Sequence, residues 1–356
     1  MKNMKNPQLT IGSRRIGVEH EPFIIAEMSG NHNKSLNNAL NIVQSAADCG
    51  VHAIKLQTYT PDTITLDIDS NDFIINDSKS LWNGKKLYEL YTLAHTPWEW
   101  HGPIIKKAKD LGLAWFSSPF DESAVDFLEE LDIPLYKIAS FENNHLPLIR
   151  KVSSTGKPVI ISIGASTLLE LDEMVTTARD AGCKDLILLK CTSSYPASPE
   201  NSNILTIPHL KKLFDCEVGL SDHTLGIGAS LAAVSHGASL IEKHFTLDRN
   251  DGGVDSVFSM EPMEMKSLVV ESKNAWQSLG SISYGLSDSE KKSVNFKRSI
   301  FISEDMELGE IFTEKNIRIV RPGNGLHPRY YEKIIGRKVS KKVSKGTALN
   351  WNHILD

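Results

Sequence analysis

The stretch LIEKHFT (240–246) is apolar at both ends and carries three ionisable side chains in its middle. Its length and its Ile, Leu and Phe content favour an inner β-strand. Burying unpaired charge costs more free energy than one strand can offset, so Glu242, Lys243 and His244 need partners or an opening. Side chains alternate along a strand, which places Glu242 and His244 on one face. We therefore expect the carboxyl end of this strand to open into a polar site.

Seven further apolar runs have the same character, and a helical pattern follows nearly every one. They span residues 23–29, 53–59, 113–119, 135–140, 158–164, 186–192 and 217–224. Such alternation predicts a parallel sheet, and eight units in about 250 residues predict a (β/α)8 TIM barrel. An open doubly wound sheet is the alternative. That fold favours a GxGxxG loop after its first strand, and EMSGNHN (27–33) does not match it.

The rest of the chain predicts a second, smaller domain. We expect the barrel to occupy residues 1–281, a polar linker to span 282–296 and a C-terminal domain to span 297–356. This last part contains two similar segments, ELGEIFTEKNI (307–317) and SKGTALNWNHI (344–354). The aligned pairs are Gly309 with Gly346, Phe312 with Leu349, and Ile317 with Ile354. Two similar turns predict a small pseudo-symmetric module.

Composition limits the classes of partner. The net charge is −5 and hydrophobic residues make up 40% of the chain, so we expect a globular protein that binds neither nucleic acid nor an anionic membrane. No run reaches the roughly 18 apolar residues of a membrane span, and four cysteines show no CxxC pair. We expect a cytoplasmic protein with reduced thiols. Cys191 ends an apolar run, where a core thiol is the simpler interpretation and a nucleophile the alternative.

Polar residues gather where the predicted strands end, which is where barrel enzymes place their active sites. The strand-end residues are Glu27, Lys55, Gln57, Ser117, Ser118, Lys137, Ser140, Ser162, Thr192, Ser193, Ser221, Asp222, His223, Glu242 and His244. His223 and His244 end neighbouring strands, so their imidazoles could bind one transition-metal ion weakly, leaving positions open for water and substrate. The alternative is a pair of hydrogen-bonded wall residues.

Lys55 and Lys137, with hydroxyls nearby, indicate a site for phosphate and carboxylate groups. A Schiff-base lysine and a structural ion pair are the competing interpretations. Glu27 and Glu142 are carboxylates at the expected mouth, able to take a proton from water or to hold a sugar hydroxyl.

The motifs IAEMSGNHN, KLQTYTPDT, FSSPFDESAVDFLE, YKIASFE, CTSSYP, GLSDHTLG and EKHFTLDR occur in this order. In order and spacing they resemble the sialic acid synthase family, over nearly the whole chain. The tail with RPGNG (321–325) is similar to the antifreeze-protein-like (SAF) domain of that family. The resemblance implies condensation of phosphoenolpyruvate with the open-chain aldehyde of an N-acetylated amino sugar, with water attack and loss of phosphate.

Site residues carried over by the resemblance fall into three groups. The phosphoenolpyruvate contacts are matched by Lys55, Ser118, Lys137, Ser140, Ser162, Ser193 and Ser221, and the sugar contacts by Gln57, Glu142, Tyr195 and Asp255. Glu27, His223 and His244 would be catalytic, with a divalent ion on the two histidines: manganese, with magnesium or cobalt as alternatives. Arg321 matches an arginine that reaches from the SAF domain into the other subunit's barrel, which implies a domain-swapped homodimer.

Within the family, AEMSGNHN (26–33) and TPWEWH (96–101) are most similar to pseudaminic acid synthases. N-acetylneuraminate synthases usually carry Gly in place of Ser29 and Asn in place of Ser193, so they and legionaminic acid synthases are the alternative. Two other classes stay open: a metal-independent Schiff-base aldolase and a non-catalytic sugar-binding protein. The second would be expected to have lost Glu27 or a histidine.

Overall fold

The computed structural model describes residues 9–78 and 80–355. The chain divides after Gly280 into two compact units, and each is described by itself. Within the described ranges, no helix combines the length and apolar character that crossing a membrane requires.

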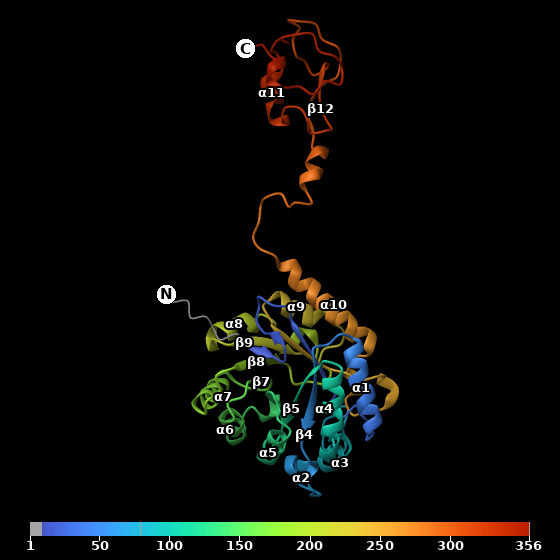
Figure 1. Cartoon of the computed structure of the whole chain (residues 1–356), viewed down its shortest axis with the longest axis vertical. Coiled ribbons are helices and arrows are strands. Elements are labelled where there is room, and N and C mark those ends of the chain that lie inside the picture. The colour runs from blue at the N-terminus through green and yellow to red at the C-terminus, as the bar shows by residue number, and fades with distance from the viewer. Residues whose placement is uncertain (1–8, 79, 356) are drawn as a thin grey trace. The chain divides into compact units, whose positions relative to one another are not determined.

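Eight parallel strands close into a barrel in the first unit, with helices packed around it (Figure 1). The strands are β3 (Phe23–Glu27), β4 (Ala53–Thr58), β5 (Ala114–Pro119), β6 (Tyr136–Ile138), β7 (Val159–Ser162), β8 (Leu186–Cys191), β9 (Glu217–Ser221) and β10 (Leu240–His244). Neighbours in the barrel follow chain order, and β10 pairs with β3 to close the ring. This closure confirms the predicted (β/α)8 class and rules out the open sheet.

A helix follows each barrel strand. The helices are α1 (Leu36–Asp48), α4 (His101–Asp110), α5 (Glu122–Glu130), α6 (Leu146–Ser154), α7 (Leu168–Asp180), α8 (Thr206–Phe214), α9 (Gly228–Ser235) and α10 (Pro262–Leu279). In α1, Ser35 caps the first turn by accepting a hydrogen bond from the Asn38 N–H. Ala39, Ile42, Val43 and Ala46 are fully buried, and their spacing of three and four residues places one face of the helix against the sheet.

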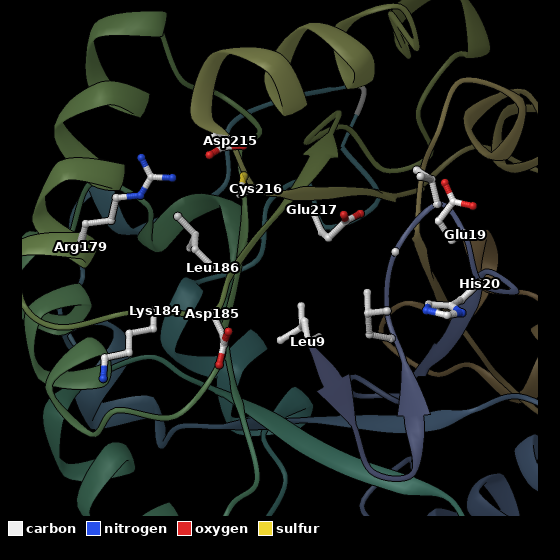
Figure 2. Close-up of a pocket in the computed structure, with 13 residues that line it drawn as sticks. Leu9, Glu19, His20, Arg179, Lys184, Asp185, Leu186, Asp215, Cys216 and Glu217 are labelled. Carbon is white, nitrogen blue, oxygen red and sulfur yellow. The ribbon is translucent and has the colours of Figure 1, made fainter. Parts of the chain in front are cut away.

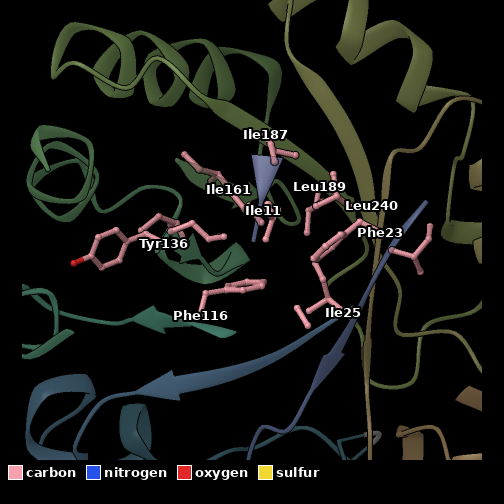
Figure 3. Close-up of a cluster of buried hydrophobic side chains, with 14 of the residues drawn as sticks. Ile11, Phe23, Ile25, Phe116, Tyr136, Ile161, Ile187, Leu189 and Leu240 are labelled. Carbon is pink, nitrogen blue, oxygen red and sulfur yellow. The ribbon is translucent and has the colours of Figure 1, made fainter. Parts of the chain in front are cut away.

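Apolar side chains fill the barrel below the strand ends (Figure 3). Ile25 lies two residues before Glu27 on β3, and Leu240 lies two residues before Glu242 on β10. In each strand the inward face is therefore apolar near its start and polar near its carboxyl end. A short hairpin, β1 (Thr10–Ile11) with β2 (Arg14–Arg15), adds Ile11 to this cluster, with 2% of its surface exposed. The sequence patterns did not predict the hairpin.

A long connection between β4 and α4 builds one side of the barrel mouth. It contains α2 (Pro61–Ile64), η1 (Asn71–Phe73), α3 (Leu87–Ala94) and η2 (Trp98–Trp100), where η denotes a 3₁₀ turn. Ile64, Ile75, Trp82 and Leu90 from this connection line the cavity described below.

The C-terminal unit has its own core. It contains η7 (Lys291–Phe296), β11 (Ser299–Ile302), β12 (Ile317–Val320), η8 (Pro328–Tyr330), α11 (Tyr331–Ile334) and η9 (Trp351–His353). The predicted internal echo has a structural counterpart, because Gly309 and Gly346 both adopt left-handed backbone, with φ of 85° and 87°. Phe312 and Leu349, which follow them at the same spacing, are both fully buried in this core.

Candidate active site

A cavity of about 400 Å³ lies at the carboxyl ends of the barrel strands. Its polar lining residues are Ser29, Gln57, Tyr59, Ser140, Glu142, Tyr195, His244 and Asp255. Polar 3₁₀ turns after the strands contribute to it, namely η3 (Ser140–Glu142) and the Asp255 cap of η6 (Ser256–Phe258). The position agrees with the barrel expectation, and six of the predicted site residues line it: Gln57, Ser140, Glu142, Tyr195, His244 and Asp255.

Strand register brings four charged side chains together beneath this cavity. Glu27 pairs in register with both Lys55 of β4 and His244 of β10. Lys55 Nζ forms an ion pair with Glu27 Oε2 and lies 3.7 Å from Glu242 Oε1. Lys137 Nζ lies 3.3 Å from that same Glu242 oxygen. Two carboxylates and two ammonium groups therefore form one buried cluster, which provides Glu242 of LIEKHFT with its partners.

The cluster sets the pKa values of its members in opposite directions. Burial raises the pKa of Glu27, and Lys55 only partly offsets it. Burial opposes charge on Glu242 as well, but Lys137 and Lys55 lower its pKa below the ordinary value. Burial lowers the pKa of Lys137, whereas the two carboxylates raise that of Lys55 against burial. Of the two carboxylates, Glu27 therefore has the higher pKa and binds a proton more readily than Glu242 does.

Two of the five predicted serines, Ser140 and Ser193, converge on Gly164, which has no side chain to keep their hydroxyls away. Ser140 Oγ accepts the Gly164 N–H at 3.1 Å. A Cβ at Gly164 would clash with Ser193 Oγ and lie 2.9 Å from Ser140 Oγ. Ser162 Oγ is buried without a hydrogen-bond partner in the described part of the chain. An unpaired buried donor beside a glycine cradle is suited to an anion.

Two further serines contact the charged cluster directly. Lys55 Nζ donates to Ser118 Oγ at 3.4 Å, and Ser221 Oγ donates to Glu242 Oε1 at 3.2 Å. Both hydroxyls are at most 4% exposed, so the anion side of the site is enclosed.

The two predicted metal ligands lie side by side, with ring centroids 5.4 Å apart. His223 Nδ1 lies 3.0 Å from the Thr192 carbonyl oxygen, which can only accept, so Nδ1 carries a proton and Nε2 is the nitrogen left to face a ligand. His244 Nδ1 is buried without a hydrogen bond to any described residue, 3.7 Å from Asp255 Oδ2. Burial lowers the pKa of His244 well below its usual value, which keeps that imidazole neutral.

These donors fit an open, weakly held ion. No group of three or more His, Cys, Asp or Glu side chains is placed to hold a metal within residues 9–78 and 80–355. Burial keeps the His244 imidazole neutral, whereas Cys191 raises the pKa of His223 above its ordinary value against the effect of burial. An ion would bind His223 in its deprotonated form, and its remaining positions would be left to water or substrate.

The sugar side of the cavity combines aromatic walls with two buried carboxylates. Tyr195 packs against His223, with ring centroids 4.4 Å apart, and Gln57 lines the same cavity. Burial raises the pKa of Glu142 to about 7, and its Oε2 has no hydrogen-bond partner among the described residues. Asp255 accepts a hydrogen bond from the Ser29 hydroxyl.

Arg321 belongs to the C-terminal unit, where it is exposed in the turn after β12. Its expected role in another subunit stays a prediction.

Comparison with known proteins agrees with this arrangement. The model of the NeuB family matches residues 42–284, more than half of the chain, and that of the SAF domain matches residues 297–355.

The chain belongs to the NeuB family.

Its relatives include a pseudaminic acid synthase of Campylobacter jejuni, which is 45% identical over 93% of this chain and 96% of its own length. A pseudaminic acid synthase of Helicobacter pylori is 42% identical over 94% of this chain and 98% of its own length. A solved N-acetylneuraminic acid synthetase of Leptospira borgpetersenii superposes with a TM-score of 0.71 and 30% identity, covering 81% of this chain and 95% of its own. These findings confirm the expected family and the SAF domain.

Three residues of this NeuB-family site were given no role by the sequence analysis. The sequence analysis placed Glu242 at the strand ends, on the same strand face as His244, but did not predict that it pairs with Lys55 and Lys137. Lys243 faces the other way and donates to Asp222 Oδ2 at 3.0 Å and to the Thr224 and Gly226 carbonyls at 2.6 and 2.8 Å. Lys243 and Asp222 therefore hold the loop that carries His223.

Cys191 is buried, but it lies outside the main apolar cluster. Its Sγ is 3.9 Å from His223 Nδ1 and 3.9 Å from Ser193 Oγ. Burial alone would raise the pKa of the thiol, but His223 lowers it to about 7. Cys191 is thus a buried free thiol, as the simpler interpretation expected, and it also borders the site.

A second cavity, of about 290 Å³, lies at the opposite ends of the strands (Figure 2). Leu186 and Glu217, the first residues of β8 and β9, line it together with Arg179 and with Leu9 and Ile16, which flank the β1–β2 hairpin. It contains none of the predicted site residues, and the N-terminal end of such a barrel serves stability rather than catalysis.

Proposed function

We propose that the protein is a pseudaminic acid synthase that condenses phosphoenolpyruvate with 2,4-diacetamido-2,4,6-trideoxy-L-altrose and water, releasing phosphate. The observation that carries this proposal is the enclosed cluster of Lys55, Lys137 and serine hydroxyls beside two free imidazoles and a sugar-sized cavity. Relatives named pseudaminic acid synthases share 42–45% identity, whereas those named N,N'-diacetyllegionaminic acid synthases share 35–36%.

The anion side binds phosphoenolpyruvate. Lys55 and Lys137 neutralise its phosphate and carboxylate, and the hydroxyls of Ser118, Ser140, Ser162, Ser193 and Ser221 donate hydrogen bonds to them. Glu242 holds both ammonium groups through one oxygen, which fixes their separation before the substrate arrives. Binding an anion to two buried ammonium groups is favourable because little reorganisation is needed.

His223 and His244 would hold a divalent ion, manganese with magnesium or cobalt as alternatives, through nitrogens that no described residue occupies. Such an ion, when bound, acts as a Lewis acid on the sugar aldehyde. Carbon 3 of phosphoenolpyruvate then attacks the aldehyde carbon. The aldehyde oxygen takes a proton, and the new C–C bond leaves a cation at carbon 2 of the former phosphoenolpyruvate.

Glu27 serves the next step. Its carboxylate takes one proton from the water that attacks carbon 2, which balances the proton gained by the aldehyde oxygen. The new hydroxyl at carbon 2 passes its remaining proton to the bridging oxygen, and phosphate departs with that oxygen to leave the 2-keto acid. The pKa raised by burial makes Glu27 a stronger base than an exposed carboxylate, and the ion pair with Lys55 favours its ionised form. Gln57, Glu142, Tyr195 and Asp255 orient the sugar.

We propose a domain-swapped homodimer in which Arg321 of one subunit completes the barrel site of the other, with the enzyme working in the cytoplasm.

The sugar decides between this reaction and its relatives. Purified enzyme, phosphoenolpyruvate and manganese are incubated with the altrose derivative, its legionaminic counterpart or N-acetylmannosamine, and the keto acid is measured by mass spectrometry. The highest kcat/KM with the altrose derivative supports the proposal. A highest value with N-acetylmannosamine would make the protein an N-acetylneuraminate synthase, and one with the second sugar a legionaminic acid synthase.

A further inference from the structure

Ser29 has a backbone conformation that favours glycine. Its φ is 47°, in the left-handed region, at the loop between β3 and α1. A serine held there costs of order 1 kcal/mol or more relative to relaxed backbone, and such strain collects at functional sites. The Ser29 N–H donates to Glu27 Oε1 at 2.8 Å, which ties the turn to the proposed base. Glycine would make this same backbone contact without strain, so the hydroxyl needs its own explanation.

The hydroxyl of Ser29 has a specific partner across the cavity. Ser29 Oγ donates to Asp255 Oδ2, joining the loop after β3 to the segment after β10. Both residues line the 400 Å³ cavity, and Ser29 is only 3% exposed. Oδ2 also lies 3.7 Å from His244 Nδ1. One oxygen of the carboxylate therefore already has a protein donor before any sugar binds.

The remaining cavity wall is largely apolar. Ile64, Ile75, Leu87, Leu90, Ala94, Phe120, Phe141 and Val254 surround the polar groups. Methyl groups of an acetamido or deoxy substituent can pack on such a wall, whereas a hydroxyl there needs a hydrogen-bond partner. Asp255 and Glu142 are the carboxylate acceptors that such a hydroxyl could use, and Ser29 already occupies one oxygen of Asp255.

We propose that Ser29, through its hydrogen bond to Asp255, determines which amino sugar the site accepts. It favours a sugar with acetamido and methyl substituents over one with hydroxyls at those positions. This inference rests on the proposed function. Replacing Ser29 with glycine would free Asp255 Oδ2 and open space the size of a hydroxymethyl group. N-acetylmannosamine, which has hydroxyls at carbons 4 and 6, should benefit more than the altrose derivative.

The test compares Ser29→Gly and Ser29→Ala with the wild type, measuring kcat/KM for both sugars at saturating phosphoenolpyruvate. We expect Ser29→Gly to shift the ratio about tenfold or more toward N-acetylmannosamine, the range that one small group in a pocket contributes. Ser29→Ala, which frees the acceptor but keeps Cβ, should shift it less in the same direction. The KM for phosphoenolpyruvate should not change.

Asp132→Gly is the matched control. Asp132 also has positive φ, 55°, but is exposed in the turn between α5 and β6, at the other end of the barrel. It should leave the ratio unchanged. An unchanged ratio in both Ser29 variants, or parallel loss with both sugars, would overturn the role of Ser29. The wild-type ranking of the sugars tests the proposed function separately, because it does not depend on the variants.

Discussion

Lys137 Nζ and Glu242 Oε1 form an ion pair at 3.3 Å in which the side chains are 2% and 5% exposed. Lys55 lies 3.7 Å from the same oxygen and also pairs with Glu27, so one oxygen of Glu242 lies close to both buried ammonium groups. This arrangement stays stable only while every member is present, because a buried charge that loses its partner is costly. The site is therefore prepared for an anion and sensitive to the loss of Glu242.

Glu242→Gln should lower the free energy of unfolding by about 3 kcal/mol or more, the usual effect of breaking a buried pair. Urea unfolding of the enzyme without ligands measures it. Asp126→Asn is the matched control, since Asp126 pairs with Lys151 at the surface, at 2.6 Å. That change should cost about 1 kcal/mol or less. Equal losses in the two variants would contradict the buried cluster.

Glu27→Gln should reduce kcat by about 10²- to 10⁴-fold, the contribution of a general base. The amide keeps the shape and the hydrogen bond from Ser29 but cannot take a proton from water. Steady-state phosphate release measures the effect. A variant that retains more than about a tenth of wild-type kcat would exclude Glu27 as the base.

The buried carboxyl of Glu142 predicts a pH effect on stability. Burial raises its pKa from 4.5 to about 7, so between these values the folded state binds a proton that the unfolded state has lost. Stability contributed by this group is therefore full below pH 4.5 and falls as the pH rises toward 7, by about 3 kcal/mol over the whole window. Unfolding of the wild type and Glu142→Gln at several pH values measures the difference. The variant should lack this component of the fall, and identical pH profiles would contradict the assignment.

Lys137 is the lysine that a Schiff-base mechanism would use, because burial lowers its pKa. In the proposed mechanism, Lys137 has only an electrostatic role. Borohydride added with both substrates should therefore leave the intact mass of the protein unchanged. A mass increase of one reduced substrate adduct, mapped to Lys137 or Lys55, would replace the proposed mechanism.

Much of the fold could be predicted because it depends on local patterns. All eight barrel strands lie within or close to the predicted runs, since buried parallel strands are continuous in apolar residues. The β1–β2 hairpin could not be predicted, because strands of two residues are too short to show a periodic pattern. The helices in the connection over residues 59–100 could not be predicted for a similar reason, since they are short and irregularly spaced.

The site could be predicted as a set of residues but not as a set of pairs. Alternation along the strands placed Glu242 and His244 on one face, yet only the register with β3 shows that His244 lies opposite Glu27. The role of Lys243 depends on two loop carbonyls, which have no signal in the side-chain sequence. The partner of Ser29 lies 226 residues away in the chain, beyond the reach of any local pattern.

The most direct test measures phosphate released from phosphoenolpyruvate by the wild-type enzyme, with and without the altrose derivative. Each reaction is run after treatment with a chelator and again after manganese is restored. Release is expected only when sugar and metal are both present. The ion held by His223 and His244 is needed to polarise the aldehyde, and without the aldehyde no keto acid can form. Full release in chelator would contradict the two-histidine metal site, and release without sugar would contradict the condensation itself.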